Sequence, residues 1–260
     1  MLNPKISVIT VSYNSSQTIL DTLRSVASQT YPNVEHLVID GLSIDNTVKL
    51  VEENRHLNLV LFSELDLGIY DAMNKGLARA SGEIIGFLNA DDFFADANVL
   101  RRIAKAFEVD PHIEACFGDL VYVTEDSLNI ERYWKSRPYE IGCFARGWSP
   151  AHPTFYIRRS ALIRLGHFDL TYRLAADTEF MMRYLECGSV RSVYIPRVQV
   201  RMRIGGVTNQ SWRNIASQNR EILQALKKNC IPYSLPSFVL HKLASRFWQR
   251  LARFKMLEST

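Results

Sequence analysis

The 260-residue sequence contains no run of about eighteen apolar residues, the length that a helix needs to cross a bilayer. Its amino terminus enters a strand-like segment almost at once and shows no apolar signal-peptide region. The four cysteines are widely spaced and form no CxxC pair, so we interpret them as reduced thiols and not as zinc ligands. Together these absences predict a cytoplasmic protein.

Two common phosphate-binding signatures are also missing. The sequence has no GxGxxG and no GxxxxGKS or GxxxxGKT, which disfavours a dinucleotide-binding domain and a P-loop. The net charge of +4 lies entirely in the segment that begins at Ser237, because acidic and basic residues balance in the rest of the chain. A neutral body argues against a nucleic-acid partner.

The first part of the chain contains strand-like segments that alternate with helical patterns. The strand-like segments are residues 6–11, 34–39, 59–62 and 83–88. Apolar side chains recur at helical spacing in residues 19–27 and 69–80, and we expect Asn14 to Ser16 to cap the first of these helices. This alternation predicts right-handed βαβ crossovers and a mostly parallel sheet, an α/β fold.

A polar or acidic residue follows every one of these strands. They are Asn14, Asp40, Glu64 and the cluster from Asn89 to Asp92. In an open α/β sheet, ligands bind at the carboxyl ends of the strands, so these side chains are candidate site residues. Asp40 stands where such a fold contacts a base or a ribose hydroxyl.

The pair Asp91 and Asp92 supplies hard oxygen ligands that suit Mg²⁺ or Mn²⁺, and a cation held there would bind a diphosphate. The alternative is that the pair caps the helix that starts near Asn98, since Asp is a favoured cap residue. Taken alone, the two residues do not separate these interpretations.

The second part of the chain has a less regular pattern. We expect a helix at 99–109, strands at 115–123, 130–133 and 154–157, a helix at 159–165, a helix to about residue 187, two short strands within 190–200 broken at Pro196, and a helix at 212–229. Residues 136–153 form a long irregular stretch with Trp148 and His152, and so long a loop is usually functional or mobile.

Five segments in order resemble the inverting nucleotide-sugar glycosyltransferases of family 2, which have the GT-A fold. The segments are residues 7–14, 39–47, 66–76, 82–92 and 175–180. The resemblance covers roughly residues 5–208 and looks closest to bacterial enzymes of exopolysaccharide, O-antigen or capsule synthesis. It implies a Rossmann-like sheet, a nucleotide-binding half at about 1–110 and an acceptor half at about 111–230.

The resemblance also implies roles for individual residues. The nucleotide-sugar would contact Thr10, Ser12, Asn14, Asp40, Asn74, Lys75, Asn89 and Asp91. Asn89 stands at the first position of the family's metal-binding DxD motif, a departure that leaves Asp91 and Asp92 to bind the metal and the ribose, with the division between the two residues open. Asp177 falls on the catalytic base. The QxxRW motif of processive synthases is missing, so one sugar is expected per encounter.

Further roles are open to a second interpretation. A carboxylate at Asp177 can take the proton of an acceptor hydroxyl, or it can cap the helix that follows. His152 and Trp148 would lie on the acceptor side. Alternatively, His152 hydrogen-bonds within its loop and Trp148 packs in the core. Arg203, beside two glycines, would close over the diphosphate as a lid.

Residues 231–260 have the pattern of a basic amphipathic helix. Leu240, Leu243 and Phe247 are among its apolar positions, while Lys242 and Arg246 fall on the basic face. We expect this tail to bring the protein to the inner face of the plasma membrane; packing on the domain or on a second copy of the chain is the alternative.

The sequence therefore predicts a metal-dependent inverting glycosyltransferase. It would move one sugar from a nucleoside-diphosphate sugar to a hydroxyl of a glycan or lipid-linked acceptor in bacterial surface polysaccharide synthesis. The competing hypotheses are a non-catalytic nucleotide-sugar-binding or membrane-scaffold protein and a nucleotidyltransferase.

Overall fold

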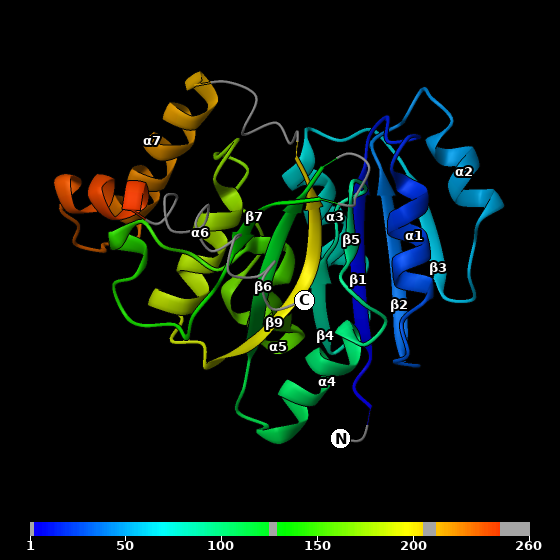
Figure 1. Ribbon diagram of the computed structural model, residues 1–260, viewed down its shortest axis with the longest axis horizontal. Helices are drawn as coiled ribbons and strands as arrows, with labels where there is room; N and C mark the ends of the chain where they lie inside the picture. The colour runs from blue at the N-terminus through cyan, green and yellow to red at the C-terminus, as the bar shows by residue number, and fades with distance from the viewer. Residues whose placement is uncertain (1–2, 125–128, 205–211, 245–260) are drawn as a thin grey trace.

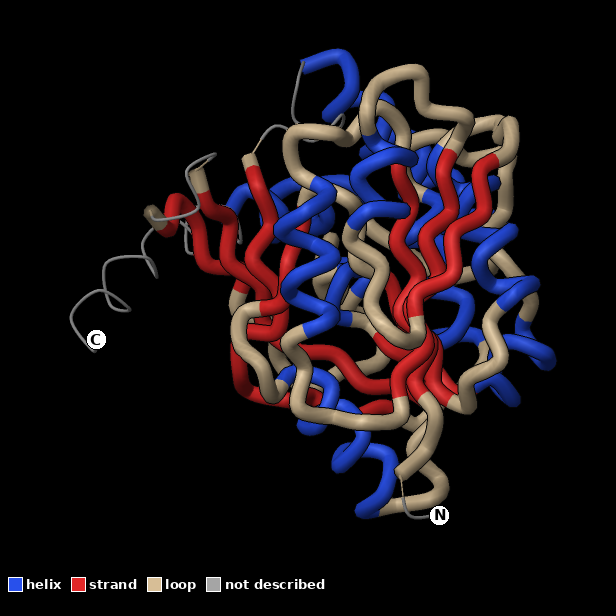
Figure 2. Tube along the Cα trace, turned by 90° about the vertical axis from the view of Figure 1, so that its right-hand side faces the viewer, coloured by secondary structure: helices blue, strands red, loops and turns tan. Residues whose placement is uncertain are grey.

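The computed structural model describes residues 3–124, 129–204 and 212–244. Within them, one nine-stranded sheet has the order β3-β2-β1-β4-β8-β6-β9-β5, and β7 pairs with β6 off this path. The strands are β1 Ile6–Ser12, β2 Val34–Asp40, β3 Leu59–Ser63, β4 Ile84–Phe87, β5 Asp92–Phe94, β6 Ala115–Val123, β7 Ile130–Trp134, β8 Tyr156–Arg158 and β9 Ser192–Arg203. Figure 2 shows these strands in red between helices.

The sheet is mixed, and the first four strands along the chain are parallel to one another. β1 pairs in parallel with β2 and β4, β2 pairs in parallel with β3, and β6 pairs in parallel with β9. β8 is antiparallel to both β4 and β6 and so joins the two halves of the sheet. The expected α/β fold with a mostly parallel sheet is confirmed.

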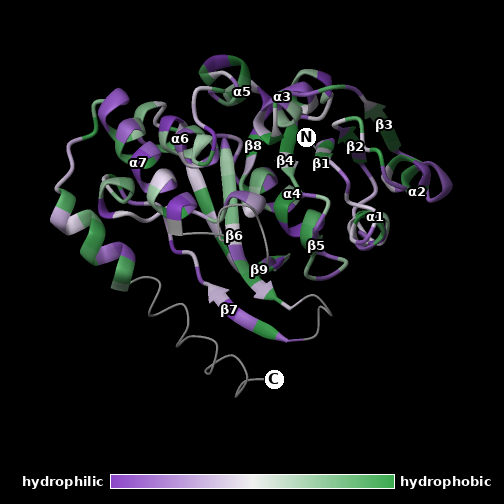
Figure 3. Cartoon of the chain, turned by 90° about the horizontal axis from the view of Figure 1, so that it is seen from above, coloured by the Kyte–Doolittle hydropathy of each residue, from purple (hydrophilic) through white to green (hydrophobic). Residues whose placement is uncertain are grey.

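Helices cover both faces of the sheet (Figures 1 and 3). They are α1 Ile19–Ala27, α2 Thr47–Glu53, α3 Ile69–Arg79, α4 Val99–Val109, α5 Arg159–Leu165, α6 Ala176–Met182 and α7 Trp212–Lys228. Alternate residues of β1 explain the two layers. Ile9 and Val11 pack in a core with α3, α6 and α7, whereas Ile6 and Val8 pack in a core with α4.

Two local expectations are wrong. Asn14 to Ser16 do not cap α1, because the N-cap position is Thr18. The two short strands expected around Pro196 are one continuous strand, β9. β9 tolerates the proline because the register shifts there: Gly118 of β6 pairs with Ile195 and Asp119 pairs with Val198. No hydrogen bond to β6 is therefore required of the proline.

The first part of the tail packs on the domain. Residues 235–244 are helical, and Phe238 is buried in the same core as α6 and α7. The rest of the tail and the glycines at 205 and 206 lie outside the described residues. None of the helices described is both long enough and apolar enough to cross a membrane.

Candidate active site

A cavity of about 1030 Å³ lies at the carboxyl edge of the parallel strands, where the two halves of the sheet meet. Its size is at the upper end of the range for small-molecule sites, about 300–1000 Å³. Seven of the predicted site residues line it: Ser12, Asn14, Asn89, Asp91, Trp148, His152 and Asp177. The first four come from the nucleotide-binding half and the last three from the acceptor half.

Asp40, at the end of β2, lies outside this lining and is fully buried. One carboxylate oxygen accepts from the hydroxyls of Ser12 (3.1 Å) and Ser43 (2.5 Å). The other accepts from the backbone N–H of Ser43 (2.9 Å) and the hydroxyl of Ser63 (2.8 Å). Asp40 thus holds in place the turn whose next residues, Gly41 and Leu42, line the cavity.

Asn14 belongs to the same polar network. Its backbone N–H donates to the hydroxyl of Ser43 (2.8 Å), and its side-chain oxygen accepts from the N–H of Ile44 (3.0 Å). Asn14 adopts a left-handed conformation with φ of 50°, which asparagine tolerates better than most residues. The side chain therefore ties the end of β1 to the turn after β2 while it borders the cavity.

Thr10, Asn74 and Lys75 also lie outside the cavity lining. The hydroxyl of Thr10 is buried against Nε2 of His36, at 2.9 Å. The side-chain amide of Asn74 donates to the carbonyl of Phe168 and accepts from its N–H, both at 2.9 Å. Lys75 donates to the carbonyl of Leu65 and pairs with acidic neighbours. The structure gives each of these residues a protein partner.

The acidic pair divides between the cavity and the interior. Asp91 lines the cavity, whereas Asp92 is the fully buried first residue of β5. Because β5 intervenes and the N-cap of α4 is Asn98, the pair does not cap that helix. Burial raises the pKa of Asp91, although Arg203 partly offsets this. Burial and the nearby charge of Asp91 hold the pKa of Asp92 well above its usual range.

This corner of the cavity has the donors for a divalent cation. Oδ1 of Asn89 and Oδ1 of Asp92 are buried and have no hydrogen-bond partner among the described residues. Together with Asp91 they present hard oxygen atoms, and a bound cation would offset the cost of burying two carboxylates. The described residues include no cluster of three or more His, Cys, Asp or Glu suited to a metal, so phosphate and water oxygens would complete its coordination.

Arg203 is buried and does not line the cavity. Its guanidinium donates to the backbone carbonyl of Asp91 (3.0 Å) and pairs with the carboxylate of Asp21 (2.5 Å). It also lies over the ring of Phe93, 5.2 Å from the ring centre. In this arrangement Arg203 fixes the backbone that carries Asp91, and a lid role would require it to leave these partners.

Asp177 reaches the cavity from the first turn of α6. The N-cap position of that helix is Ala175, so Asp177 is not the cap. Its Oδ1 accepts from the N–H of Thr178 (2.7 Å) and from the hydroxyl of Tyr70 (3.3 Å), a residue of α3. Asp177 is therefore held by contacts from both halves of the chain.

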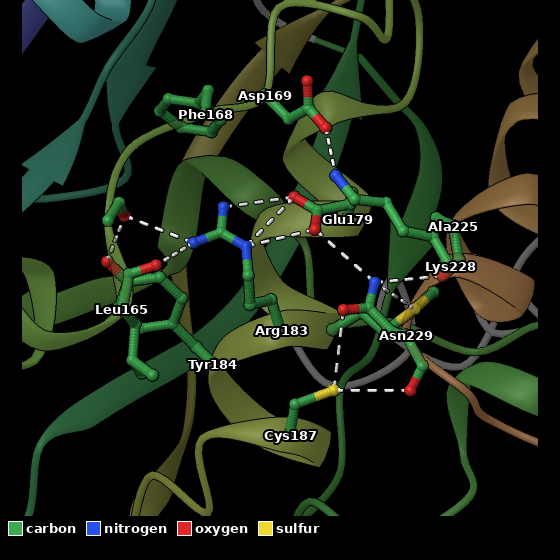
Figure 4. A network of polar contacts seen from close by, with 12 residues as sticks. Leu165, Phe168, Asp169, Glu179, Arg183, Tyr184, Cys187, Ala225, Lys228 and Asn229 are labelled. Atoms are coloured by element: carbon green, nitrogen blue, oxygen red, sulfur yellow. Dashed lines mark hydrogen bonds and ion pairs between the residues drawn. The ribbon is translucent and has the colours of Figure 1, made fainter.

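Buried polar contacts anchor α6 at its other side (Figure 4). Glu179 is fully buried and pairs with Arg183 at 3.1 Å. Arg183 also donates to the carbonyl of His167 at 2.6 Å. Asn229, just after α7, donates to Glu179 at 3.5 Å. These contacts fix the helix that carries Asp177 against the loop before it and the end of α7.

His152 lies beside this helix in the acceptor half. The ring stacks on Phe87 (5.4 Å) and meets the edge of Phe168 (5.7 Å). Burial lowers the pKa of His152, while Asp177 acts in the opposite direction. Only 8% of the residue is exposed, and its Nε2 has no hydrogen-bond partner among the described residues. A polar atom placed in this way at a cavity wall is suited to a substrate partner.

Several cavity-lining residues escaped the sequence interpretation: Asp66, Tyr70, Arg132, Trp134, Phe238 and Lys242. Asp66 and Tyr70 lie in a family segment, so that segment could have pointed to them. Arg132 and Trp134 alternate along β7 and share one face, a period that predicts a strand but not a cavity wall. Lys242 was expected on the basic face of the tail helix, yet it lines the cavity and donates to Asn219 of α7 at 2.5 Å.

Comparison with known proteins agrees with this geometry. An uncharacterised glycosyltransferase of Mycobacterium tuberculosis is 31% identical over 182 residues, which are 69% of this chain and 68% of the relative. A PGL/p-HBAD biosynthesis glycosyltransferase of Mycobacterium bovis is 30% identical over 186 residues, 70% of each chain.

Solved structures that share the fold include two with bound nucleotide-sugar. The mannosyltransferase PcManGT from Pyrobaculum calidifontis, in complex with GDP-Man and Mn²⁺, matches with a TM-score of 0.65 and 22% identity, over 100% of this chain and 75% of that one. The TarS 1–349 structure from S. aureus, in complex with UDP-GlcNAc, matches with a TM-score of 0.65 and 21% identity, over 85% of this chain and 66% of that one.

The family model for glycosyl transferase family 2 matches residues 7–173, which include almost all of β1 and the parallel strands β2, β3 and β4 that follow it. These residues are more than half of the chain, and curated relatives above 30% identity cover more than two thirds of it. The chain thus belongs to glycosyl transferase family 2, and it is a nucleotide-sugar-dependent glycosyltransferase with the GT-A fold.

Proposed function

We propose that this glycosyltransferase is metal-dependent and inverting, and that it moves one sugar per encounter from a nucleoside-diphosphate sugar to a hydroxyl of a glycan or lipid-linked acceptor in bacterial surface polysaccharide synthesis. The observation that carries the proposal is that Asp91 and Asp177, from opposite halves of the chain, line one cavity. An acidic group for the leaving diphosphate and a second one for the acceptor are what direct displacement requires.

The donor would occupy the wall made by the ends of β1 and β4. Ser12 and Asn14 border the nucleotide end, and Asn89 and Asp91 border the diphosphate end. Asn89, Asp91 and Asp92 would hold Mn²⁺ or Mg²⁺, which supplies Lewis-acid stabilisation of the leaving group when it is bound. The complexes of the two structural relatives, one with GDP-Man and Mn²⁺ and one with UDP-GlcNAc, support this class of donor.

The acceptor would enter from the wall that carries Trp148, His152 and Asp177. Its hydroxyl oxygen forms a bond to the anomeric carbon while the bond from that carbon to the phosphate oxygen breaks. The electron pair leaves with the nucleoside diphosphate, and the hydroxyl proton passes to the carboxylate of Asp177. Attack from the face opposite the leaving group inverts the anomeric configuration. Nε2 of His152 would hydrogen-bond the acceptor.

A thermal-shift screen of nucleotide-sugars with and without Mn²⁺ tests the donor and the metal together. A donor at a hundredfold excess over its Kd stabilises the fold by about 2.7 kcal/mol, which raises the Tm of a chain of this size by roughly 5–10 °C. We expect one nucleotide-sugar to do so strongly only with Mn²⁺, and the product of transfer, analysed by NMR, to have the inverted anomeric configuration. An equal shift without the cation, or a retained configuration, would contradict the proposal.

We further propose that the tail brings the enzyme to an anionic membrane surface. The described helix at 235–244 buries Phe238 against the domain but leaves Leu240 and Leu243 exposed, at 68% and 62%. The basic residues of the sequence beyond it, among them Arg246 and Arg250, would add about 1 kcal/mol each near anionic lipid. Exposed apolar side chains followed by basic ones suit the lipid interface.

Removal of the whole tail would also remove Phe238 from the core, so a sharper test removes residues 245–260 or changes Leu240→Glu with Leu243→Glu. Both variants should lose sedimentation with vesicles of anionic phosphatidylglycerol while keeping transfer to a soluble acceptor. Leu57→Glu is a matched control, because Leu57 is 97% exposed in the segment between α2 and β3. Unchanged sedimentation of both tail variants would refute the membrane proposal.

A further inference from the structure

Helix α3 belongs to the nucleotide-binding half, yet two residues on one of its faces contact the acceptor half. Tyr70 and Asn74 are four positions apart, so they lie on the same side of the helix. The amide of Asn74 makes two hydrogen bonds of 2.9 Å to the backbone of Phe168. The ring of Tyr70 lies 5.7 Å from the ring of Phe168, and its hydroxyl donates to Asp177.

The two oxygens of Asp177 differ in their environment. Oδ1 accepts from the N–H of Thr178 at 2.7 Å and from the hydroxyl of Tyr70 at 3.3 Å. Oδ2 has no hydrogen-bond or ion-pair partner within the part of the chain that the structure describes. Because Asp177 lines the cavity, Oδ2 is the atom available to a ligand there.

Tyr70 is suited to hold Oδ1 without releasing its own proton. Burial and the adjacent charge of Asp177 hold the pKa of the Tyr70 hydroxyl well above its usual range. The phenol therefore keeps its proton at neutral pH and can donate a hydrogen bond to Oδ1. It also lines the cavity, next to the donor-side loop that contains Asp66 and Gly68.

We propose that Tyr70 is a positioning residue for the catalytic base: its hydroxyl fixes Oδ1 of Asp177, so that Oδ2 faces the acceptor hydroxyl and receives its proton. Asn74 holds the loop before α6 and so keeps the two halves in register for this contact. The inference rests on the proposed role of Asp177. It adds that α3, a helix of the nucleotide-binding half, sets the position of the carboxylate of Asp177. Misplacement of a reacting group by about 1 Å can reduce a rate a hundredfold.

The test compares Tyr70→Phe with Tyr133→Phe in the full chain. Tyr133 is a matched control because its hydroxyl also donates to a buried carboxylate, Asp119 at 2.5 Å, and because it does not line the cavity. For Tyr70→Phe we expect kcat to fall about ten- to a hundredfold, with the KM for the nucleotide-sugar within twofold of the wild type. The Tm should fall no further than in Tyr133→Phe.

A kcat within twofold of the wild type would overturn the inference. So would a lower kcat accompanied by an equal loss of donor affinity, since that result indicates general damage to the site. Asn74→Ala is a second test variant. It should also lower kcat, although Asn74 makes no hydrogen bond to the carboxylate of Asp177. A wild-type kcat in both Tyr70→Phe and Asn74→Ala would show that the contact between α3 and the acceptor half has no part in the mechanism.

Asp177→Asn, measured beside these variants, separates the inference from the proposed function. If Asp177→Asn transfers sugar at the wild-type rate, the base assignment itself fails. If Asp177→Asn is inactive while Tyr70→Phe is normal, only the positioning role fails.

Discussion

The two sides of the site carry similar polar residues, but they differ in whether the buried polar atoms of those residues have hydrogen-bond partners. On the β1–β2 side, the oxygens of Asp40 are occupied by four protein donors. On the β4–α6 side, Asn89, Asp92 and His152 each keep a buried polar atom without a partner among the described residues. A saturated carboxylate stabilises a fold, whereas an unsatisfied buried group costs free energy that a ligand can recover. The second side is therefore where we place the chemistry.

The largest effect that would sharpen this comparison is the loss of Asp91. Asp91→Ala should reduce Mn²⁺-dependent transfer by at least about a hundredfold, because several kcal/mol of transition-state stabilisation depend on that corner. Its free energy of unfolding should stay the same or rise, since a desolvated carboxylate with a raised pKa is removed. Kinetics and urea denaturation measure the two effects, and a large fall in stability would show that Asp91 belongs to the structural side.

Asp40→Asn should give the reverse result. The new NH₂ group would face hydroxyl and N–H donors, and lost hydrogen bonds to a charged group cost about 1.5–3 kcal/mol. We expect the free energy of unfolding to fall by about 3 kcal/mol while kcat, measured well below the Tm, stays within a few-fold. If kcat falls a hundredfold at unchanged stability, Asp40 contacts the donor directly, as its position after β2 suggested.

The sequence predicts where polar residues end the strands, but it does not predict what their side chains contact. The β-branched run of β1 and the apolar run of β4 are local patterns, and they place polar residues at strand ends. Whether a strand-end carboxylate faces protein or cavity depends on partners far along the chain, such as Ser63 for Asp40 or Tyr70 for Asp177. Periodicity contains no such information.

The tail shows the same limit at the level of a helix. Its amphipathic pattern identified apolar and basic positions but not which of them would meet the domain. Phe238 is buried, Lys242 lines the cavity and contacts α7, and the left-handed turn at Gly147 packs closely against both residues. Pro196 predicted a break between two strands, but β9 is continuous. The register shift that accommodates the proline arises in the pairing with β6, which the local sequence does not reveal.

Two buried histidines offer a matched pair for a smaller effect. His36 has partners on both ring nitrogens, Thr10 at 2.9 Å and His56 at 3.0 Å, whereas Nε2 of His152 has none among the described residues. His152→Phe keeps the stacking on Phe87 and should raise the KM for the acceptor about tenfold with no loss of stability. His36→Phe should instead lower the free energy of unfolding by about 1–2 kcal/mol and leave KM unchanged. Equal effects on KM would remove the distinction.

The smallest expected effect is a pH dependence of the free energy of unfolding that arises from His36, whose ring nitrogens both have partners. Burial, with a contribution from His56, lowers the pKa of His36 to about 3. An unfolded histidine titrates near 6.5, so between these values the unfolded state binds a proton that the folded state does not. Stability is therefore complete above about 6.5 and is lost as the pH falls toward 3, by roughly 0.8 kcal/mol at pH 6 for this group. Urea denaturation from pH 8 to pH 5 should show a shallower decline in His36→Phe than in the wild type, and parallel curves would mean that folding does not change the pKa of His36.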